Sequence, residues 1–98
     1  MDHADAVIGI LEEVVRIVDR PETDVAWSQY NNVQETVKDI KHHIARLQND
    51  DFSRIEDLAM LFAPTGSLQE ISISSGWGDE FLEIAARFDR AVAPLRQA

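Results

Sequence analysis

Apolar residues in the middle of the chain recur at alternating spacings of four and three positions. The residues that carry this pattern are Ala26, Tyr30, Val33, Val37, Ile40, Ile44 and Leu47. Such spacing places them on one narrow face of an α-helix over three heptads. We therefore expect a helix from Ala26 to Leu47 that packs into one groove of a bundle at a crossing angle of about 20°. The same seam also permits a coiled-coil dimer, but a bundle within one chain is favoured because the other helices need a partner.

The first helix is expected from about Ala4 to Asp19, ending before Pro21, which cannot continue a helix. Its apolar residues cover about half of the helix circumference, whereas a surface helix needs only about 100°. They are Val7, Ile8, Ile10, Leu11, Val14, Val15, Ile17 and Val18. This helix should therefore touch two neighbours, or one neighbour and a second subunit.

Two further helices complete the prediction. A short one carries the apolar face Phe52, Ile55, Leu58, Ala59 and Phe62, begins at a cap on Asp51 or Ser53 and ends at Pro64. The last helix begins near Asp79 and carries the stripe Phe81, Ile84, Ala85, Phe88, Ala91, Val92 and Leu95. The prediction is a single all-α domain over residues 1–98, a four-helix bundle of up-and-down type.

The segment from about residue 64 to residue 78 does not follow this helical pattern. It is rich in Gly and Ser, yet it contains Leu68, Ile71, Ile73 and Trp77. We expect an irregular packed connector or a short helical turn across one end of the bundle, with Ser67 and Glu70 spaced as a capping box. The alternative is a strand at residues 71–74, where apolar and polar residues alternate, and it would need a pairing partner.

The charge balance limits the classes of partner. The chain has 18 acidic and 9 basic residues, a net charge of −9, and no cysteine. Nucleic acid and anionic membrane surfaces are therefore poor partners, and a basic protein is a better one. The acidic N-terminus does not resemble a secretory signal, and no apolar run approaches the 20 or so residues of a membrane span. We expect a cytoplasmic protein without disulfides, thiol catalysis or a cofactor.

Residues 61–73, Leu-Phe-Ala-Pro-Thr-Gly-Ser-Leu-Gln-Glu-Ile-Ser-Ile, resemble a signature of small uncharacterised bacterial proteins. That signature reads Leu-Phe-Gly, two residues, Gly-Ser, Leu or Phe, Asn or Gln, Asp or Glu, and then apolar residues. The resemblance extends from Trp27 to Val92, but Ala63 and Pro64 stand where the family tends to have glycines, and Gln69 where it prefers Asn. It implies a domain of unknown function, and small acidic helical proteins of this kind are similar to immunity proteins of bacterial toxin systems.

The first candidate site is a partner-binding patch of Trp77 with Glu70, Asp79 and Glu80. Tryptophan is enriched at binding hot spots, and the carboxylates would attract a basic partner. The alternatives are that Trp77 fills the core at a helix start and that the carboxylates cap helices. Two carboxylates beside an apolar pocket could also perform acid–base chemistry. We assign no catalytic residue.

Asp39 and His43 are the second candidate, because a spacing of four residues lets both side chains hold one cation from a single helix face. A metal site needs three or four ligands, so a solvated charged face is favoured and no metal is assigned. The function that we predict is a non-enzymatic acidic interaction domain, such as a toxin inhibitor. A small metal- or carboxylate-dependent enzyme and a structural homodimer are the alternatives.

Overall fold

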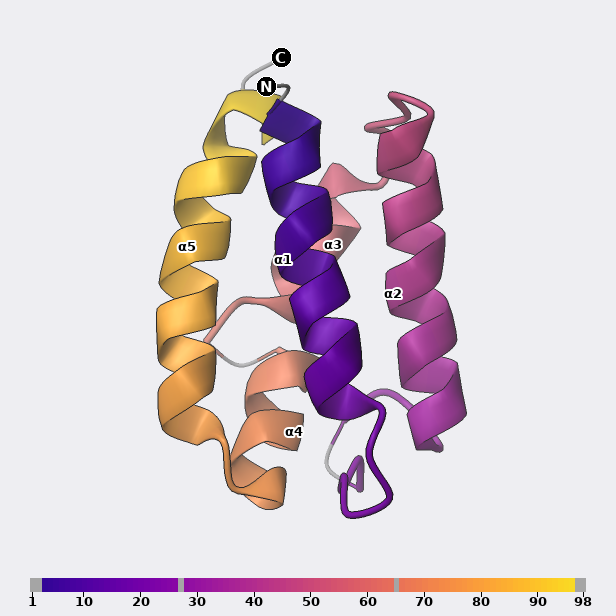
Figure 1. The fold of residues 1–98 in the computed structure, drawn as a ribbon, viewed down its shortest axis with the longest axis vertical. Helices are drawn as coiled ribbons and strands as arrows, with labels where there is room; N and C mark the ends of the chain where they lie inside the picture. Colours follow the sequence, from indigo (N-terminus) through magenta and orange to yellow (C-terminus); the bar gives the residue numbers. More distant parts are fainter. Residues whose placement is uncertain (1–2, 27, 65, 97–98) are drawn as a thin grey trace.

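The computed structural model describes residues 3–26, 28–64 and 66–96, and within them the secondary structure is entirely helical (Figure 1). The helices are α1 (His3–Val18), α2 (Val33–Gln48), α3 (Ile55–Leu61), α4 (Ser67–Ser75) and α5 (Gly78–Arg96). The radius of gyration is 12.6 Å, which is the value expected for a compact chain of this length. The all-α prediction is confirmed, but the bundle has five described helices instead of four.

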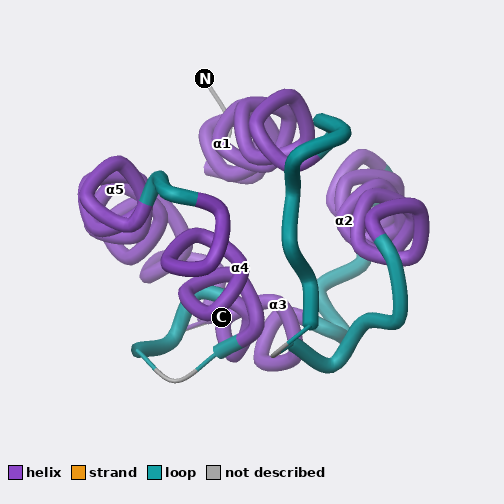
Figure 2. The backbone as a smooth tube through the Cα atoms, turned by 90° about the horizontal axis from the view of Figure 1, so that it is seen from below, coloured by secondary structure: helices purple, strands orange, loops and turns teal. Residues whose placement is uncertain are grey.

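Helix α1 lies between α2 and α5, with α2 packed on one side and α5 on the other (Figure 1). Helices α3 and α4 pack against α5 and against each other, and Figure 2 shows them across the bundle from α1. The buried side chains of α1 are Ala4, Val7, Ile10, Leu11, Val14, Ile17 and Val18. The prediction of two neighbours is confirmed. Both belong to the same chain, and they leave none of the large apolar side chains of α1 exposed for a second subunit.

Helix α2 begins at Val33, so the prediction of a start at Ala26 is wrong. Asn32 is the N-cap, and its side chain accepts a hydrogen bond of 2.8 Å from the backbone N–H of Glu35. Upstream, the Asp24 carboxylate accepts the N–H of Ala26 in a local turn. Such side-chain to backbone bonds compete with helix formation, which is why the apolar spacing continues further than the helix does.

The face that α2 buries is also rotated from the predicted seam. Its buried residues are Thr36, Ile40, His43 and Leu47. Val33, Val37 and Ile44 lie at the edge of this face and are only half-buried. Two of the four buried positions are therefore polar, although the apolar pattern predicted a fully apolar contact.

Helix α3 begins at Ile55, and neither of the predicted cap residues, Asp51 and Ser53, is its N-cap. The N-cap position is Arg54, which makes no side-chain cap. The Asp51 carboxylate instead accepts hydrogen bonds from the N–H and hydroxyl of Ser53, at 3.0 and 2.6 Å. Glu56 pairs with Arg96 of α5 at 2.8 Å, which makes an exposed ion pair between α3 and α5.

The sequence predicted an irregular connector or a short helical turn in this segment. The helical form is confirmed, although helix α4 is longer than one turn, and the strand alternative is wrong. The helix has nine residues and ends at Gly76, whose φ of 88° is the left-handed conformation that favours glycine. Gly66 is its N-cap, and the predicted capping box from Ser67 is absent. A Cβ on Gly66 would lie 2.3 Å from the carbonyl oxygen of Met60, so glycine allows α3 and α4 to follow each other closely.

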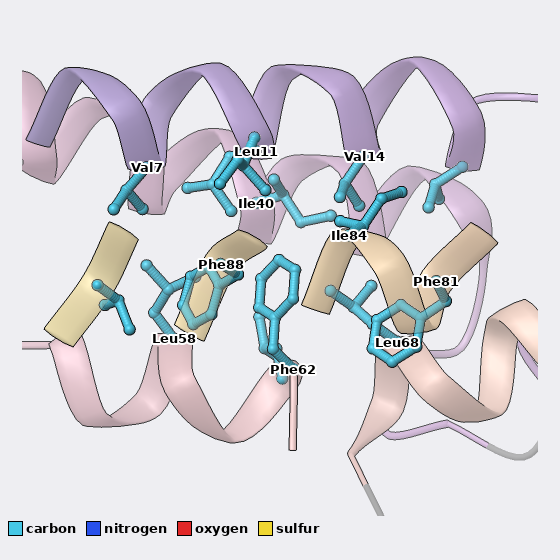
Figure 3. Packing of buried hydrophobic residues seen from close by; sticks show 14 of the residues in the cluster. Val7, Leu11, Val14, Ile40, Leu58, Phe62, Leu68, Phe81, Ile84 and Phe88 are labelled. Carbon is cyan, nitrogen blue, oxygen red and sulfur yellow. The ribbon is translucent and has the colours of Figure 1, made fainter. Parts of the chain in front are cut away.

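One apolar core joins all five helices (Figure 3). Phe62 and Phe88 stack with their ring centroids 3.9 Å apart and their planes at 4°, and Phe81 lies 6.2 Å from Phe62. Leu11 of α1 and Ile40 of α2 face this aromatic group from the opposite side (Figure 3). In the described part of the chain, no helix is long and apolar enough to cross a membrane.

Candidate functional site

Trp77 belongs to the core and does not form the contact patch that the sequence predicts. Its side chain is only 6% exposed, and its ring packs edge-on against Phe81 with centroids 6.2 Å apart. Its backbone N–H bonds to the carbonyl of Ser72 at 2.8 Å and its carbonyl accepts the N–H of Phe81, so it links α4 to α5. The alternative in which Trp77 fills the core at a helix start is confirmed. Trp27 lies outside the described residues.

The three predicted carboxylates do not form one cluster. Glu70 is half-buried in the first turn of α4, whereas Asp79 and Glu80 are exposed in the first turn of α5. Negative charges in a first turn stabilise the positive end of the helix dipole. This local role accounts for the position of each residue in the first turn of its helix.

An exposed apolar surface does occur where α4 meets α5, and we call Ile73, Gly78 and Leu82 the α4–α5 corner. Ile73 is 59% exposed and Leu82 is 62% exposed. A Cβ on Gly78 would lie 3.6 Å from Cγ1 of Ile73, and Leu82 follows Gly78 by one helical turn. The two aliphatic side chains therefore belong to one surface.

Two of the predicted carboxylates flank this corner. Glu70 precedes Ile73 by three residues, and Asp79 precedes Leu82 by three, so each shares a helix face with an exposed aliphatic group. Glu80 precedes Leu82 by two residues and lies on a different face of α5. The sequence contained a signal for Leu82, because this residue falls outside the apolar stripe of the last helix.

The second feature is a cleft of about 480 Å³, which we call the polar cleft. It lies between α2, α3, the start of α4 and the loop that precedes α2. Its charged and polar lining consists of Gln29, Asp39, His43, Arg46, Arg54, Asp57 and Ser67. Sequence reasoning named Asp39 and His43 but missed Arg46, Asp57 and Ser67, which come from other turns and helices.

His43 is buried beside Arg46 in this cleft, with only 5% of its surface exposed. Nη1 of Arg46 lies 3.3 Å from Nδ1 of His43. A guanidinium can only donate, so Nδ1 accepts this bond and the ring is neutral, with its proton on Nε2. Burial lowers the pKa of His43, and Arg46 and His42 lower it further, against the opposing charge of Asp39.

Asp39 binds the phenol of Tyr30, whose O–H donates to Oδ2 of the carboxylate at 2.5 Å. Burial raises the pKa of Tyr30, and the hydrogen bond and charge of Asp39 raise it further, so the phenol stays protonated. Asp39 and His43 line the same cleft, but Arg46 occupies one nitrogen of His43 and repels a cation. Among the described residues, no group of three or more His, Asp or Glu side chains is placed to hold a metal ion.

Three serine hydroxyls of α4 support the fold. Ser67 Oγ accepts the N–H of Gln29 at 3.2 Å, and Ser75 Oγ accepts the N–H of Asp24 at 2.9 Å. The Ser72 hydroxyl donates to the carbonyl of Gln69 at 2.7 Å. The first two bonds fasten the loop between α1 and α2 to α4, and that loop closes one end of the polar cleft.

Comparison with protein-family models, with curated proteins and with solved structures gives no match to this chain. The resemblance to small bacterial proteins therefore stays a prediction, and any function has to be argued from the surfaces described above.

Proposed function

We propose that this protein is a non-enzymatic interaction domain that binds a basic protein partner through the α4–α5 corner. The observation that carries the proposal is the exposure of Ile73 and Leu82, at 59% and 62%, on either side of Gly78 at the α4–α5 junction. They are two of the three large apolar side chains exposed in the described residues, the third being Met60 on α3. A toxin inhibitor is one form that such an interaction domain can take.

The energetics of the corner suit a small hot spot. Full burial of an aliphatic side chain contributes about 1.5–3 kcal/mol, so covering both groups would supply a meaningful part of a binding free energy. Glu70 and Asp79 would form the charged edge of the contact, and the net charge of −9 would speed the approach of a basic partner. Trp77 supports the corner from within because it fixes the junction of α4 and α5.

The first test is the capture of partners from the lysate of the source cell by the tagged protein, at low and at high salt. We expect one basic protein to be retained at low salt and lost at high salt. The double variant Ile73→Ser/Leu82→Ser should bind it at least about tenfold more weakly, a loss of 1.4 kcal/mol or more. Met60→Ser is the matched control, because it removes an equally exposed apolar side chain from α3.

A matched pair of variants tests the contribution of the charged edge to binding. Asp79→Asn should weaken binding and reduce its salt dependence, whereas Glu80→Gln, one residue further along on another face of α5, should leave both nearly unchanged. A partner that binds the Ile73/Leu82 double variant as tightly as it binds the unmodified protein would refute the proposal. Salt-independent binding would refute its electrostatic part.

A further inference from the structure

The polar cleft contains charges of both signs in a protein that is strongly acidic overall. Asp39 and Asp57 line it together with Arg46 and Arg54. Arg54 pairs with Oδ2 of Asp57 at 3.1 Å, and Tyr30 occupies Oδ2 of Asp39. In the described part of the chain, the Oδ1 atoms of both carboxylates make no hydrogen bond with the protein, and each is therefore available to a cationic group.

Two nearly buried polar side chains in the same cleft each have an unused donor. His43 is 5% exposed and gives Nδ1 to Arg46, while Ser67 is 9% exposed and accepts the N–H of Gln29 at Oγ. The Nε2–H of His43 and the hydroxyl proton of Ser67 have no acceptor within the described residues. Both side chains line the cleft, so an acceptor bound there would take these donors.

The start of α4 adds to this donor set. Gly66 and Ser67 line the cleft, and the Gly66 cap provides no side-chain acceptor for the first N–H groups of the helix. Those N–H groups and the helix dipole favour an anion at this end. The guanidinium of Arg46 also lines the cleft and would attract an anion, whereas Asp39 on α2 would attract a cation.

We propose that the polar cleft binds a small zwitterion, namely a free α-amino acid. Its carboxylate would lie against the start of α4, Ser67 and Arg46, and its ammonium group would lie against Asp39. The cleft volume of about 480 Å³ falls within the range of small-molecule sites. The carboxylates disfavour a multiply charged phosphate, and the guanidinium beside His43 disfavours a metal ion.

The test is a titration of the ¹⁵N-labelled full chain with each common free α-amino acid, followed by amide chemical shifts. Acetate and methylammonium are the controls, since each carries only one of the two charges. We expect at least one amino acid to give saturable shifts at Asp39, His43 and Ser67, and neither control to do so at the same concentration. Equal shifts with acetate, shifts confined to other regions, or no saturable shift with any amino acid would overturn the proposal.

Paired variants then test the two ends of the cleft. Asp39→Asn and Arg46→Gln should each weaken binding of that amino acid at least about tenfold. Asp89→Asn and Arg90→Gln are the matched controls, because both residues are exposed on α5, outside the cleft. Unchanged affinity in both cleft variants would also overturn the proposal. If a cleft variant fails to fold, the comparison between amino acids and single-charge controls decides the question alone. This inference does not depend on the α4–α5 corner.

Discussion

Helices α5 and α2 pack on opposite sides of α1, and they meet the core in different ways. The buried residues of α5 are Phe81, Ile84, Phe88, Val92 and Leu95, all of them apolar. The buried residues of α2 are Thr36, Ile40, His43 and Leu47, of which half are polar. In addition, α5 supports α3 and α4, whereas α2 packs chiefly on α1 and is separated from α3 by the polar cleft.

This difference indicates that the α5 side contributes mainly to stability and the α2 side mainly to the capacity to bind a ligand. Apolar side chains in close contact gain dispersion energy and carry no polar group of their own, so the α5 side should hold most of the stability. On the α2 side, the Thr36 hydroxyl donates to the carbonyl of Asn32 at 3.1 Å and His43 bonds to Arg46. Polar residues at core positions contribute less burial free energy, but they can offer donors and acceptors to a ligand.

The largest expected effect is on the α5 side. Phe88→Ala should destabilise the protein by about 3–5 kcal/mol, because it removes a fully buried ring that stacks on Phe62. Thr36→Val, at an equally buried position of α2, should change the free energy of unfolding by less than about 1 kcal/mol, since it replaces a satisfied hydroxyl with a methyl group of similar size. Urea unfolding of both variants measures the contrast. Equal losses of stability in the two variants would show that the α5 side and the α2 side contribute alike to the free energy of unfolding.

The next effect concerns the junction of α3 and α4. Gly66→Ala should cost about 1–3 kcal/mol, because the new Cβ would lie 2.3 Å from the carbonyl oxygen of Met60 and the backbone would have to shift. Gly9→Ala is the control, and it is expected to raise the free energy of unfolding instead of lowering it. A Cβ at Gly9, within α1, meets no atom within 4 Å, and the change should stabilise the helix by about 0.5–1 kcal/mol. Thermal unfolding distinguishes the two, and a stable Gly66→Ala variant would contradict the tight junction.

The elements that could be predicted from the sequence are those with long apolar stripes. The predicted start and end of α1 and the predicted start of α5 each agree with the structure to within one residue. The start of α2 could not be predicted from periodicity, because Ala26 and Tyr30 continue the apolar spacing through a loop that Asn32 terminates. For helix α4 the sequence indicated no more than a short helical turn, because its serines favour turns locally, and burial of Leu68 and Ile71 against the core outweighs that preference.

The candidate sites were less predictable than the fold. The positions of Asp39, His43 and Arg46 follow from helical spacing on α2 alone, but Asp57 and Ser67 join them only through the packing of α3 and α4. The burial of Trp77 and the exposure of Ile73 likewise depend on how α4 sits on α5. Sequence spacing reports on one helix at a time, so it cannot specify a site that several helices share.

A smaller effect should appear in the pH dependence of the stability that the α2 side contributes. Burial lowers the pKa of His43 below its usual value of about 6.5, so the unfolded chain binds more protons than the folded one as the pH falls through this range. The stabilising contribution is therefore present above about pH 6.5 and is lost as the pH falls through the folded-state pKa. His43→Leu should flatten the stability profile below about pH 6.5. Urea unfolding at several pH values measures the slope.

The smallest effect tests how far ion pairs hold the α5 side together. Arg87 binds both carboxylate oxygens of Glu13, at 2.8 and 2.9 Å, and so links α5 to α1. Both side chains keep more than a third of their surface exposed, so water and salt screen the pair. A double-mutant cycle with Arg87→Gln and Glu13→Gln should therefore give a coupling energy of less than about 1 kcal/mol. This coupling energy should fall as the salt concentration rises. The more exposed pair of Arg96 and Glu56 should give still less. A larger, salt-independent coupling at Arg87 would mean that charge pairing, and not apolar packing alone, distinguishes the α5 side from the α2 side.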